Sequence, residues 1–285
     1  MSCAVRVSAY AKINLSLRVL GVRPDGYHDL RTIFQSIALH DTLTVRARRG
    51  AFALECDDPA CPADETNLVW RAAEQVWAAA GRRGLLRDVE IRLAKRIPLK
   101  SGLGGGSSDA AAALRALGSL WRVKDAPLRE VASRLGADVP YFLEGGTVLG
   151  LDRGDLLYPL VDYSVAWVTL VVPSFGVSTV DAYRWWDETG ASARTRPADL
   201  QNDLQGPVAA HHPEIARIVS SLQKAGAFHA AMSGSGSAVF GLFSRRPAAE
   251  RAVLAAQKSG ARALLTRTLN RSAYQRLTGM GVSKK

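Results

Sequence analysis

The residues from 98 to 113 read PLKSGLGGGSSDAAAA and combine clustered glycines with two adjacent hydroxyl groups. Four glycines, at positions 102 and 104–106, are followed at once by Ser107 and Ser108. Because glycine has no Cβ atom, its backbone can approach an anion closely and adopt positive φ angles. A helix that begins there adds unpaired N–H groups and the positive end of its dipole. The segment therefore predicts a phosphate-binding loop.

The same segment differs from two common phosphate motifs. No GK[ST] follows the last glycine, as a Walker A motif requires, and Ser107 stands where the Rossmann fingerprint has its third glycine. A tight turn that uses glycine only for geometry is the alternative, which the paired serines and the following alanines disfavour. Asp109 is unexpected beside a phosphate, and could favour the helix dipole or help to hold a metal ion.

Three other places put polar side chains where chemistry could occur. Lys12 and Asn14 lie on the polar face of an alternating strand, for which a solvent-facing surface is the simplest interpretation. Asp138 lies in GADVPYF, where the local sequence alone favours a capping or turn-stabilising role. The segment SGSG at 233–236 resembles the first loop in composition, and a simple hairpin turn explains it as well as a ligand-contacting loop does.

The elements that must position these residues are predicted from hydrophobic periodicity. Val89, Ile91 and Leu93 alternate with Glu90 and Arg92, so residues 88–95 form a half-buried strand before the glycine-rich segment. A helix begins near residue 107 and continues through the alanines. The other elements expected before residue 160 are a long strand at 5–20, a turn at 23–26, further strand at 30–48, a helix at 67–80 capped within 64–66, and a helix at 127–135.

The pattern changes near residue 160, where we place a domain boundary. We expect strands at 165–172, 228–232, 237–243 and 262–269, and helices that begin near 178, at 213–224 and at 247–258, with a loop at 190–200. Strand, helix, strand, strand, helix, strand is the split βαβ order. The sequence therefore predicts an N-terminal domain at 1–160 and a C-terminal domain at 161–285.

Composition limits the class of protein. The chain has 285 residues, of which 47% are hydrophobic, and no apolar run approaches the roughly 20 residues that span a bilayer. The first residues lack the apolar core of a signal peptide, so we expect a cytoplasmic protein with no membrane partner. Three cysteines without a CxxC pair indicate neither a disulfide framework nor a zinc site. The formal net charge of +11 suits an anionic partner, either a phosphorylated small molecule or nucleic acid.

Three segments together resemble the GHMP kinases: AYAKINLSLRVLG near the N-terminus, PLKSGLGGGSSDAA, and MSGSGSAVF. The resemblance implies an α+β fold of two domains, a ribosomal-protein-like N-terminal α+β domain and a ferredoxin-like C-terminal domain. RPDGYHDLRTIFQSI, LGADVPYFL and QNDL are similar to one member in particular. That member phosphorylates a hydroxyl on the methylerythritol part of a cytidine diphosphate compound, in isoprenoid precursor biosynthesis.

The resemblance also implies cofactors and roles. ATP and Mg²⁺ are the expected cofactors, with a small-molecule cytidine diphosphate substrate and no nucleic acid. Lys12 and Asp138 are the implied catalytic pair, and Asn14, Tyr27 and His28 fall at positions near the substrate. The implied ATP phosphate loop consists of Pro98, Leu99, Lys100, Ser101, Gly102, Leu103, Gly104, Gly105, Gly106, Ser107 and Ser108. Lys100-Ser101 departs from the family, which often has small residues there, so Lys100 could help to hold phosphate or point to solvent.

Phosphoryl transfer needs positioning and charge neutralisation more than covalent help. Asp138 is then the base that takes the proton of the acceptor alcohol, and Lys12 keeps it ionised and stabilises the acceptor oxygen. Tyr27 offers a flat face to a pyrimidine and His28 a hydrogen bond to its edge, although Tyr27 packing on the sheet and His28 capping the turn would explain both.

Two alternatives remain at this level. A GHMP kinase for a different small-molecule alcohol would use the same glycine-rich loop, but GYH after the first strand and GADVP argue against it. A non-catalytic nucleic-acid-binding module would explain the basic charge and predicts salt-dependent RNA binding without ATP turnover. It does not explain two glycine motifs together with a Lys/Asp pair.

Overall fold

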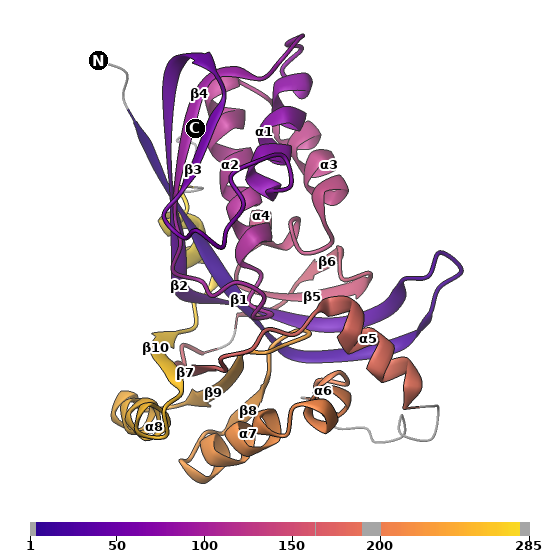
Figure 1. Cartoon of the computed structure of the whole chain (residues 1–285), viewed down its shortest axis with the longest axis vertical. Helices are drawn as coiled ribbons and strands as arrows, with labels where there is room; N and C mark the ends of the chain where they lie inside the picture. The colour runs from indigo at the N-terminus through magenta and orange to yellow at the C-terminus, as the bar shows by residue number, and fades with distance from the viewer. Residues whose placement is uncertain (1–3, 163, 190–200, 280–285) are drawn as a thin grey trace.

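The computed structural model describes residues 4–162, 164–189 and 201–279, and two β-sheets form its framework (Figure 1). The first sheet contains β1 (Val5–Val22), β2 (His28–Ala51), β3 (Ala53–Cys56), β4 (Arg87–Ala94), β5 (Thr147–Asp152) and β6 (Leu156–Pro159). The second contains β7 (Trp167–Val172), β8 (His229–Met232), β9 (Val239–Phe243) and β10 (Arg262–Arg267). The helices are α1 (Leu68–Ala79), α2 (Gly105–Trp121), α3 (Asp125–Leu135), α4 (Tyr141–Glu144), α5 (Thr179–Glu188), α6 (Gln205–His211), α7 (Glu214–Lys224), α8 (Arg246–Lys258) and α9 (Arg271–Leu277).

The long strand β2 organises the first sheet. One edge of β2 pairs antiparallel with β1, while its other edge pairs with β5 through its first half and with β4 through its second half. The pairing of β1 changes register three times, and Lys12 and Asn14 lie between two of these irregularities. Such irregularities bend a strand and re-aim its side chains. The bend in β1 therefore falls at the two residues that the sequence singles out.

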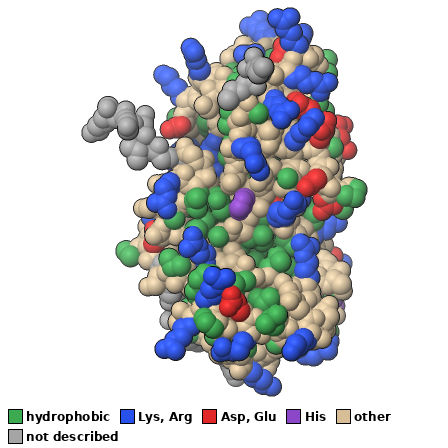
Figure 2. All heavy atoms as spheres, turned by 90° about the vertical axis from the view of Figure 1, so that its left-hand side faces the viewer, with side chains coloured by type: hydrophobic (Ala, Val, Ile, Leu, Met, Phe, Trp, Pro, Cys, Tyr) green, Lys and Arg blue, Asp and Glu red, His purple; other side chains and the backbone are tan. Residues whose placement is uncertain are grey.

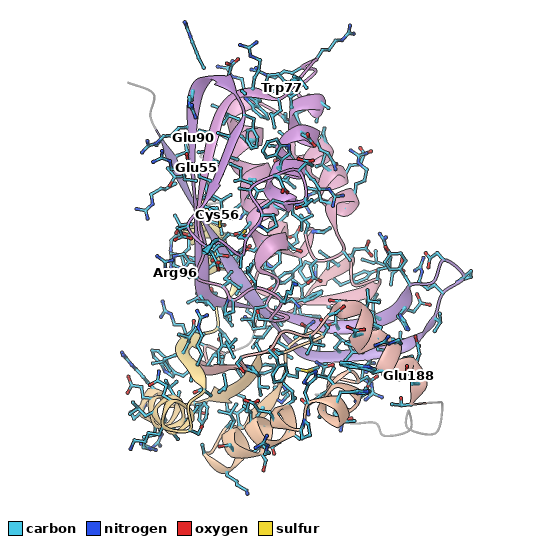
Figure 3. The ribbon with its side chains drawn as sticks, in the orientation of Figure 1. Glu55, Cys56, Trp77, Glu90, Arg96 and Glu188 are labelled. Carbon is cyan, nitrogen blue, oxygen red and sulfur yellow. The ribbon has the colours of Figure 1, made fainter. Side chains whose placement is uncertain are left out.

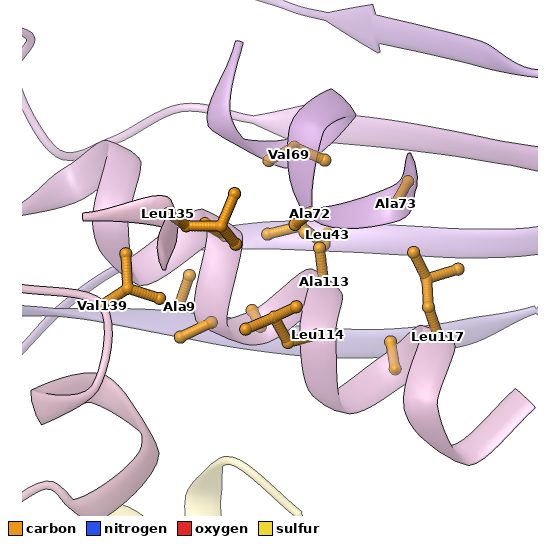
Figure 4. Close-up of a cluster of buried hydrophobic side chains, with 14 of the residues drawn as sticks. Ala9, Leu43, Val69, Ala72, Ala73, Ala113, Leu114, Leu117, Leu135 and Val139 are labelled. Atoms are coloured by element: carbon orange, nitrogen blue, oxygen red, sulfur yellow. The ribbon is translucent and has the colours of Figure 1, made fainter. Parts of the chain in front are cut away.

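Helices α1, α2 and α3 cover one face of the first sheet and form the larger hydrophobic core with it (Figure 4). Ala113, Leu114 and Leu117 of α2 meet Ala9 of β1 and Leu43 of β2 in this core (Figure 4). The run of alanines in α2, fully buried at positions 110–113, lets this helix lie close to the strands. The start of α2 is thereby held at a fixed height above β1.

The second sheet has the ferredoxin-like arrangement that was expected. Its order is β10-β7-β9-β8, all antiparallel, with α7 packed on β8 and β9 and α8 packed on β7 and β10. A layer that includes Ile13 and Ile37 of the first sheet and Leu170 and Phe240 of the second joins the two cores. Both faces of β1 are consequently buried around residue 13.

The final helix α9 returns to the first sheet after the second sheet is complete. Tyr274 is fully buried, its hydroxyl donates to the carbonyl of Phe142 (2.7 Å), and its ring lies 5.9 Å from the ring of Tyr10. The first sheet ends at Pro159 and the second begins at Trp167. The domain limits 1–160 and 161–285 stay predictions, with the added observation that α9 contacts the N-terminal part.

Most expected elements are present, with shifts of a few residues. The helix α2 begins at Gly105 rather than near Ser107, and α3 at Asp125 rather than at 127. Asn67, not a residue within 64–66, caps α1, and it accepts a hydrogen bond from Val69 N (2.9 Å). The elements that the sequence did not predict are β3, β5, β6, α4, α6 and α9. The expected loop at 190–200 lies outside the described residues.

Figure 2 shows how positive charge is distributed over one face of the molecule. On the face shown in Figure 2, Lys and Arg side chains stand apart from one another rather than forming one continuous stripe. Within the described ranges, no helix is both long enough and apolar enough to cross a membrane.

Candidate active site

A cavity of about 1490 Å³ lies between the two sheets and gathers most of the predicted site residues. Its wall contains Lys12, Asn14, Tyr27, His28, Asp138 and every residue from Pro98 to Ser107. The start of α5 and residues 234–236 of the second glycine motif complete it. Lys12 and Asp138, which are 126 positions apart in the sequence, thus line the same cavity.

The glycine-rich loop presents free backbone N–H groups to this cavity. Gly104 precedes α2 in the left-handed conformation (φ 71°) without a side-chain cap, and the first hydrogen bond of the helix runs from Ser108 N to Gly104 O (2.9 Å). The N–H groups of residues 105–107 precede that bond and are open to a ligand. A Cβ atom at Gly104 would lie 2.7 Å from the ring of Phe142, so both conformation and space require glycine. The arrangement suits an anion.

The second glycine motif holds the first one in place. Ser233 Oγ donates to Gly102 O (3.0 Å), and Ala238 N donates to Ser101 O (3.0 Å). The Asn202 side chain, from the QNDL segment, donates in turn to Met232 O (2.8 Å) and Gly234 O (2.7 Å). The segment 233–236 therefore joins β8 to β9 and also forms part of the cavity wall. The hairpin-turn interpretation is consistent with this position, whereas ligand contact by the segment stays a prediction.

Lys12 and Asp138 form an ion pair inside the cavity. Lys12 Nζ lies 3.5 Å from Asp138 Oδ2 and donates to Asn14 Oδ1 (2.6 Å). The Asn14 amide donates to Thr32 Oγ1 (2.7 Å), which donates to Ser16 O (2.7 Å). Lys12 is 4% exposed and Asn14 2%, so the solvent-facing interpretation is wrong. Gly104 of the glycine-rich loop, Gly234 and the Phe34 ring pack around the Lys12 side chain on this face of β1.

Asp138 does not cap the helix that follows it. Pro140 occupies the N-cap position of α4, and no side chain caps that helix. The Asp138 side chain is 34% exposed and its Oδ2 faces the Lys12 ammonium. A carboxylate that is reached by solvent and held beside a buried cation is available to a bound alcohol.

The turn after β1 places Tyr27 and His28 on the opposite wall. His28 Nε2 lies 3.0 Å from Asp187 Oδ1, and its ring stacks on Tyr183 at a centroid distance of 4.6 Å. Tyr27 is 59% exposed. Asp25, not His28, accepts the turn hydrogen bond from Tyr27 N (3.1 Å). Neither residue is therefore explained by the capping and sheet-packing alternatives.

Ser108 and Asp109 point away from the cavity. The buried Ser108 hydroxyl donates to Tyr10 O (2.7 Å), which ties α2 to β1. Asp109 Oδ2 accepts from Lys95 Nζ (2.7 Å), and the same ammonium donates to Asp41 Oδ2 (2.5 Å). Asp109 lies at neither a helix end nor a metal cluster, and the described residues contain no group of three or more potential metal-binding side chains.

Lys95, Asp41 and Asp109 form a buried ion triad that sequence reasoning missed. All three side chains are at most 3% exposed, and Asp109 Oδ1 has no partner in the described part of the chain. Burial raises the pKa of Asp109 to about 8; the nearby Lys95 charge opposes this, and the Asp41 charge adds to it. One ammonium cannot balance two carboxylates, which favours the neutral form of Asp109. No local signal in the sequence pairs residues 41, 95 and 109.

A second cavity, of about 900 Å³, opens on the other side of residues 95–99. Lys95, Pro98 and Leu99 line both cavities, whereas Arg96 lines only the second. Figure 3 shows Arg96 at the edge of the molecule, near the level where the two sheets meet. Residues 95–99, which follow β4 and lead into the glycine-rich loop, thus separate the two cavities.

Comparison with known proteins assigns the family. The family models "GHMP kinases N terminal domain" and "GHMP kinases C terminal" match residues 67–146 and 187–262. The 4-diphosphocytidyl-2-C-methyl-D-erythritol kinase of Pelotomaculum thermopropionicum is 42% identical, covering 92% of this chain and 97% of its own. The chain belongs to the GHMP kinases.

Further comparisons agree with this assignment. The 4-diphosphocytidyl-2-C-methyl-D-erythritol kinase of Solibacter usitatus is 45% identical to this GHMP kinase, covering 86% of this chain and 83% of its own. A crystal structure of 4-(cytidine 5'-diphospho)-2C-methyl-D-erythritol kinase superimposes with a TM-score of 0.79 at 34% identity, covering 93% and 99% of the two chains. The chain is thus a small-molecule kinase with the two-domain fold that the sequence predicted.

We expect the stability of this GHMP kinase to fall as the pH rises from about 5 to 8. The pKa of Asp109 is about 8 in the folded protein and near 3.8 in its ordinary state. The folded protein therefore binds one more proton than the unfolded chain across this window, and the free energy of unfolding decreases with pH. The decrease is up to about 1.4 kcal/mol per pH unit. Denaturant unfolding at a series of pH values measures it.

The matched control is Asp109→Asn, which keeps the shape of the side chain but cannot titrate. In this variant the free energy of unfolding should decrease less with rising pH, because the contribution of Asp109 is gone. Equal slopes in the two proteins would show that Asp109 is already ionised in the fold at pH 5.

Proposed function

We propose that this GHMP kinase transfers the γ-phosphate of ATP to a hydroxyl of 4-diphosphocytidyl-2-C-methyl-D-erythritol, in non-mevalonate isoprenoid precursor biosynthesis. The observation that carries the proposal is one cavity that combines three features. These are free N–H groups at the start of α2, the Lys12–Asp138 ion pair, and the turn with Tyr27 and His28. The relatives of that name align over most of this chain. A cytoplasmic location and the absence of a nucleic-acid partner stay predictions.

The donor phosphates bind at the glycine-rich loop. Residues 105–107 line the cavity, their N–H groups have no acceptor within the helix, and the dipole of the 17-residue helix α2 favours negative charge there. The backbone of the whole loop from Pro98 to Ser107 lines the cavity, whereas the Ser108 hydroxyl serves the contact between α2 and β1.

Hydroxyl and carboxylate oxygens, the hard donors that Mg²⁺ prefers, lie on the cavity wall at Ser107 and Asp138. The Ser107 hydroxyl, at the first turn of α2 beside the proposed phosphate site, would help to hold the ion. Mg²⁺ in kinases is held by few protein groups, by substrate phosphates and by water, so the lack of an acidic cluster among the described residues fits. When bound, the ion neutralises charge on the phosphate oxygens.

Asp138 accepts the proton of the acceptor hydroxyl as the new P–O bond forms. The Lys12 ammonium, 3.5 Å away, favours the charged form of this carboxylate and stabilises the developing alkoxide. Asn14 fixes the direction of the Lys12 side chain, because its amide bonds both Lys12 and Thr32. Asn14 thus stays a candidate substrate contact, and its hydrogen bonds give it a positioning role as well.

The cytidine end of the acceptor lies at the turn after β1. Asp187 engages His28 Nε2 and the Tyr183 ring stacks against the imidazole, so the His28 ring has a fixed orientation on this wall. The exposed Tyr27 ring is free to stack on a pyrimidine. The Arg153 guanidinium lies 5.7 Å from the Tyr27 ring and adds positive charge beside it.

Turnover with defined alcohols tests the proposal. We expect ADP release in a coupled assay with 4-diphosphocytidyl-2-C-methyl-D-erythritol, and none above background with mevalonate, homoserine or galactose. The reason is that only the first compound has a base to occupy the wall at Tyr27 and His28. Turnover with one of the other alcohols instead would assign a different GHMP kinase activity.

Replacing Asp138 by Asn should lower kcat about 10²- to 10⁴-fold, because general-base catalysis contributes that much. Binding of both substrates, measured by calorimetry, should change little. A variant that binds both substrates and keeps near-normal turnover would exclude Asp138 as the base.

Replacing Tyr27 by Ala should raise KM for the cytidylyl substrate about tenfold or more, because a stacked base is worth roughly 1–3 kcal/mol. The KM for ATP should stay the same. The exposed Tyr158 provides a matched control, since it lies on β6 outside the cavity wall. Equal effects of Tyr27→Ala on both KM values would mean that the side chain only supports the fold.

A further inference from the structure

The cations around the main cavity differ in how their charge is balanced. Within the described residues, the cationic side chains on its wall are Lys12, Lys95, Lys100, Arg153 and Arg184. Four of them have carboxylate partners, namely Asp138 for Lys12, Asp41 and Asp109 for Lys95, Asp155 for Arg153, and Asp181 for Arg184. Lys100 forms no ion pair with the described residues. Its charge is therefore available to a ligand.

The backbone at Lys100 is unusual for a residue with a side chain. Its φ angle is 50°, in the left-handed region that favours glycine. Strained conformations of this kind persist where the surrounding structure or a function requires them. A lysine here thus carries a conformational cost that glycine would avoid.

Gly176, which faces Lys100, leaves room for the aliphatic part of the Lys100 side chain. A Cβ atom on Gly176 would lie 3.1 Å from Lys100 Cβ and 3.8 Å from its Cδ. The aliphatic part of Lys100 therefore lies along the chain segment that leads into α5, where both residues line the cavity. With its aliphatic part held at the cavity wall, Lys100 can extend its ammonium to a ligand in the cavity.

We propose that the Lys100 ammonium binds the phosphates of the nucleoside triphosphate donor. The inference rests on the proposed function, because it takes the donor phosphates to lie at the glycine-rich loop. Lys100 belongs to that same loop, five residues before Gly105, whose N–H begins the anion-binding turn. A free ammonium beside polyphosphate gives charge-assisted hydrogen bonds, which exceed neutral ones in strength. The acceptor diphosphate is the competing ligand, and the test separates the two.

Two substitutions at Lys100 separate its charge from its backbone strain. Lys100→Gln removes the charge and keeps a long side chain, whereas Lys100→Gly removes the charge and also relieves the positive φ. Calorimetry should show the Kd for ATP with Mg²⁺ raised about tenfold in both. Lys100→Arg should keep the Kd within about twofold of the unsubstituted protein, and the affinity for the acceptor should change in none of them.

Thermal unfolding supplies a readout that a structural role would not give. Without ligand, Lys100→Gly should unfold at the same or a higher temperature than the unsubstituted protein, although it binds ATP less tightly. Arg122→Gly is the matched control: Arg122 has a φ of 58°, is exposed, and lies at the opposite end of α2. It should gain stability in the same way and keep full ATP affinity.

The outcomes are distinguishable. Unchanged ATP affinity in Lys100→Gln, or weakened affinity only for the acceptor, would overturn the assignment of Lys100 to the donor. A lower unfolding temperature of Lys100→Gly with proportionate loss of all binding would make Lys100 a structural residue. If the unsubstituted protein binds no ATP, the proposed function itself fails, and the inference fails with it.

Discussion

The active site depends on the buried triad of Lys95, Asp41 and Asp109. The Lys95 ammonium joins β2, the end of β4 and the second turn of α2. All three side chains are buried, with at most 3% of each exposed. Asp41 also accepts backbone hydrogen bonds from Arg96 and Ile97, which fixes the chain just before the glycine-rich loop. Buried charges persist only when partners compensate them, so these contacts tolerate little displacement. The loop therefore starts and ends at points that the triad holds.

The two halves of the chain contribute different walls of one cavity. The first sheet supplies Lys12, and the helical layer supplies the anion-binding turn of α2 and the Asp138 segment. The second sheet supplies the β8–β9 turn, which hydrogen-bonds to Ser101 and Gly102. Phosphoryl transfer requires donor, acceptor and base to be held in alignment, which rigid supports of this kind provide.

The sequence predicted those parts of the site whose chemistry is local. Clustered glycines before an alanine-rich helix, and a lysine in an alternating strand, are signals within about ten residues. Ser108 shows the limit, because successive helical residues turn by about 100° and its hydroxyl faces β1 while Ser107 faces the cavity. The pairing of Lys95 with Asp41 joins residues 54 positions apart, and the burial of Lys12 requires the two glycine motifs to pack around it. Both depend on tertiary packing that periodicity does not encode.

The hydrogen bonds between the two glycine motifs have a consequence for how such a protein can change. Ser233 and Ala238 bond to the carbonyls of Gly102 and Ser101, and a Cβ atom at Gly102 would lie 2.0 Å from Ser233 O. The nucleotide loop is thus built by both halves and is not a module that one half carries alone. Recombination that exchanges the C-terminal half must preserve these backbone contacts between residues 101–102 and 233–238. Changes of substrate preference in this architecture are therefore expected at residues on the rim of the cavity, while the contacts between the two glycine motifs stay the same.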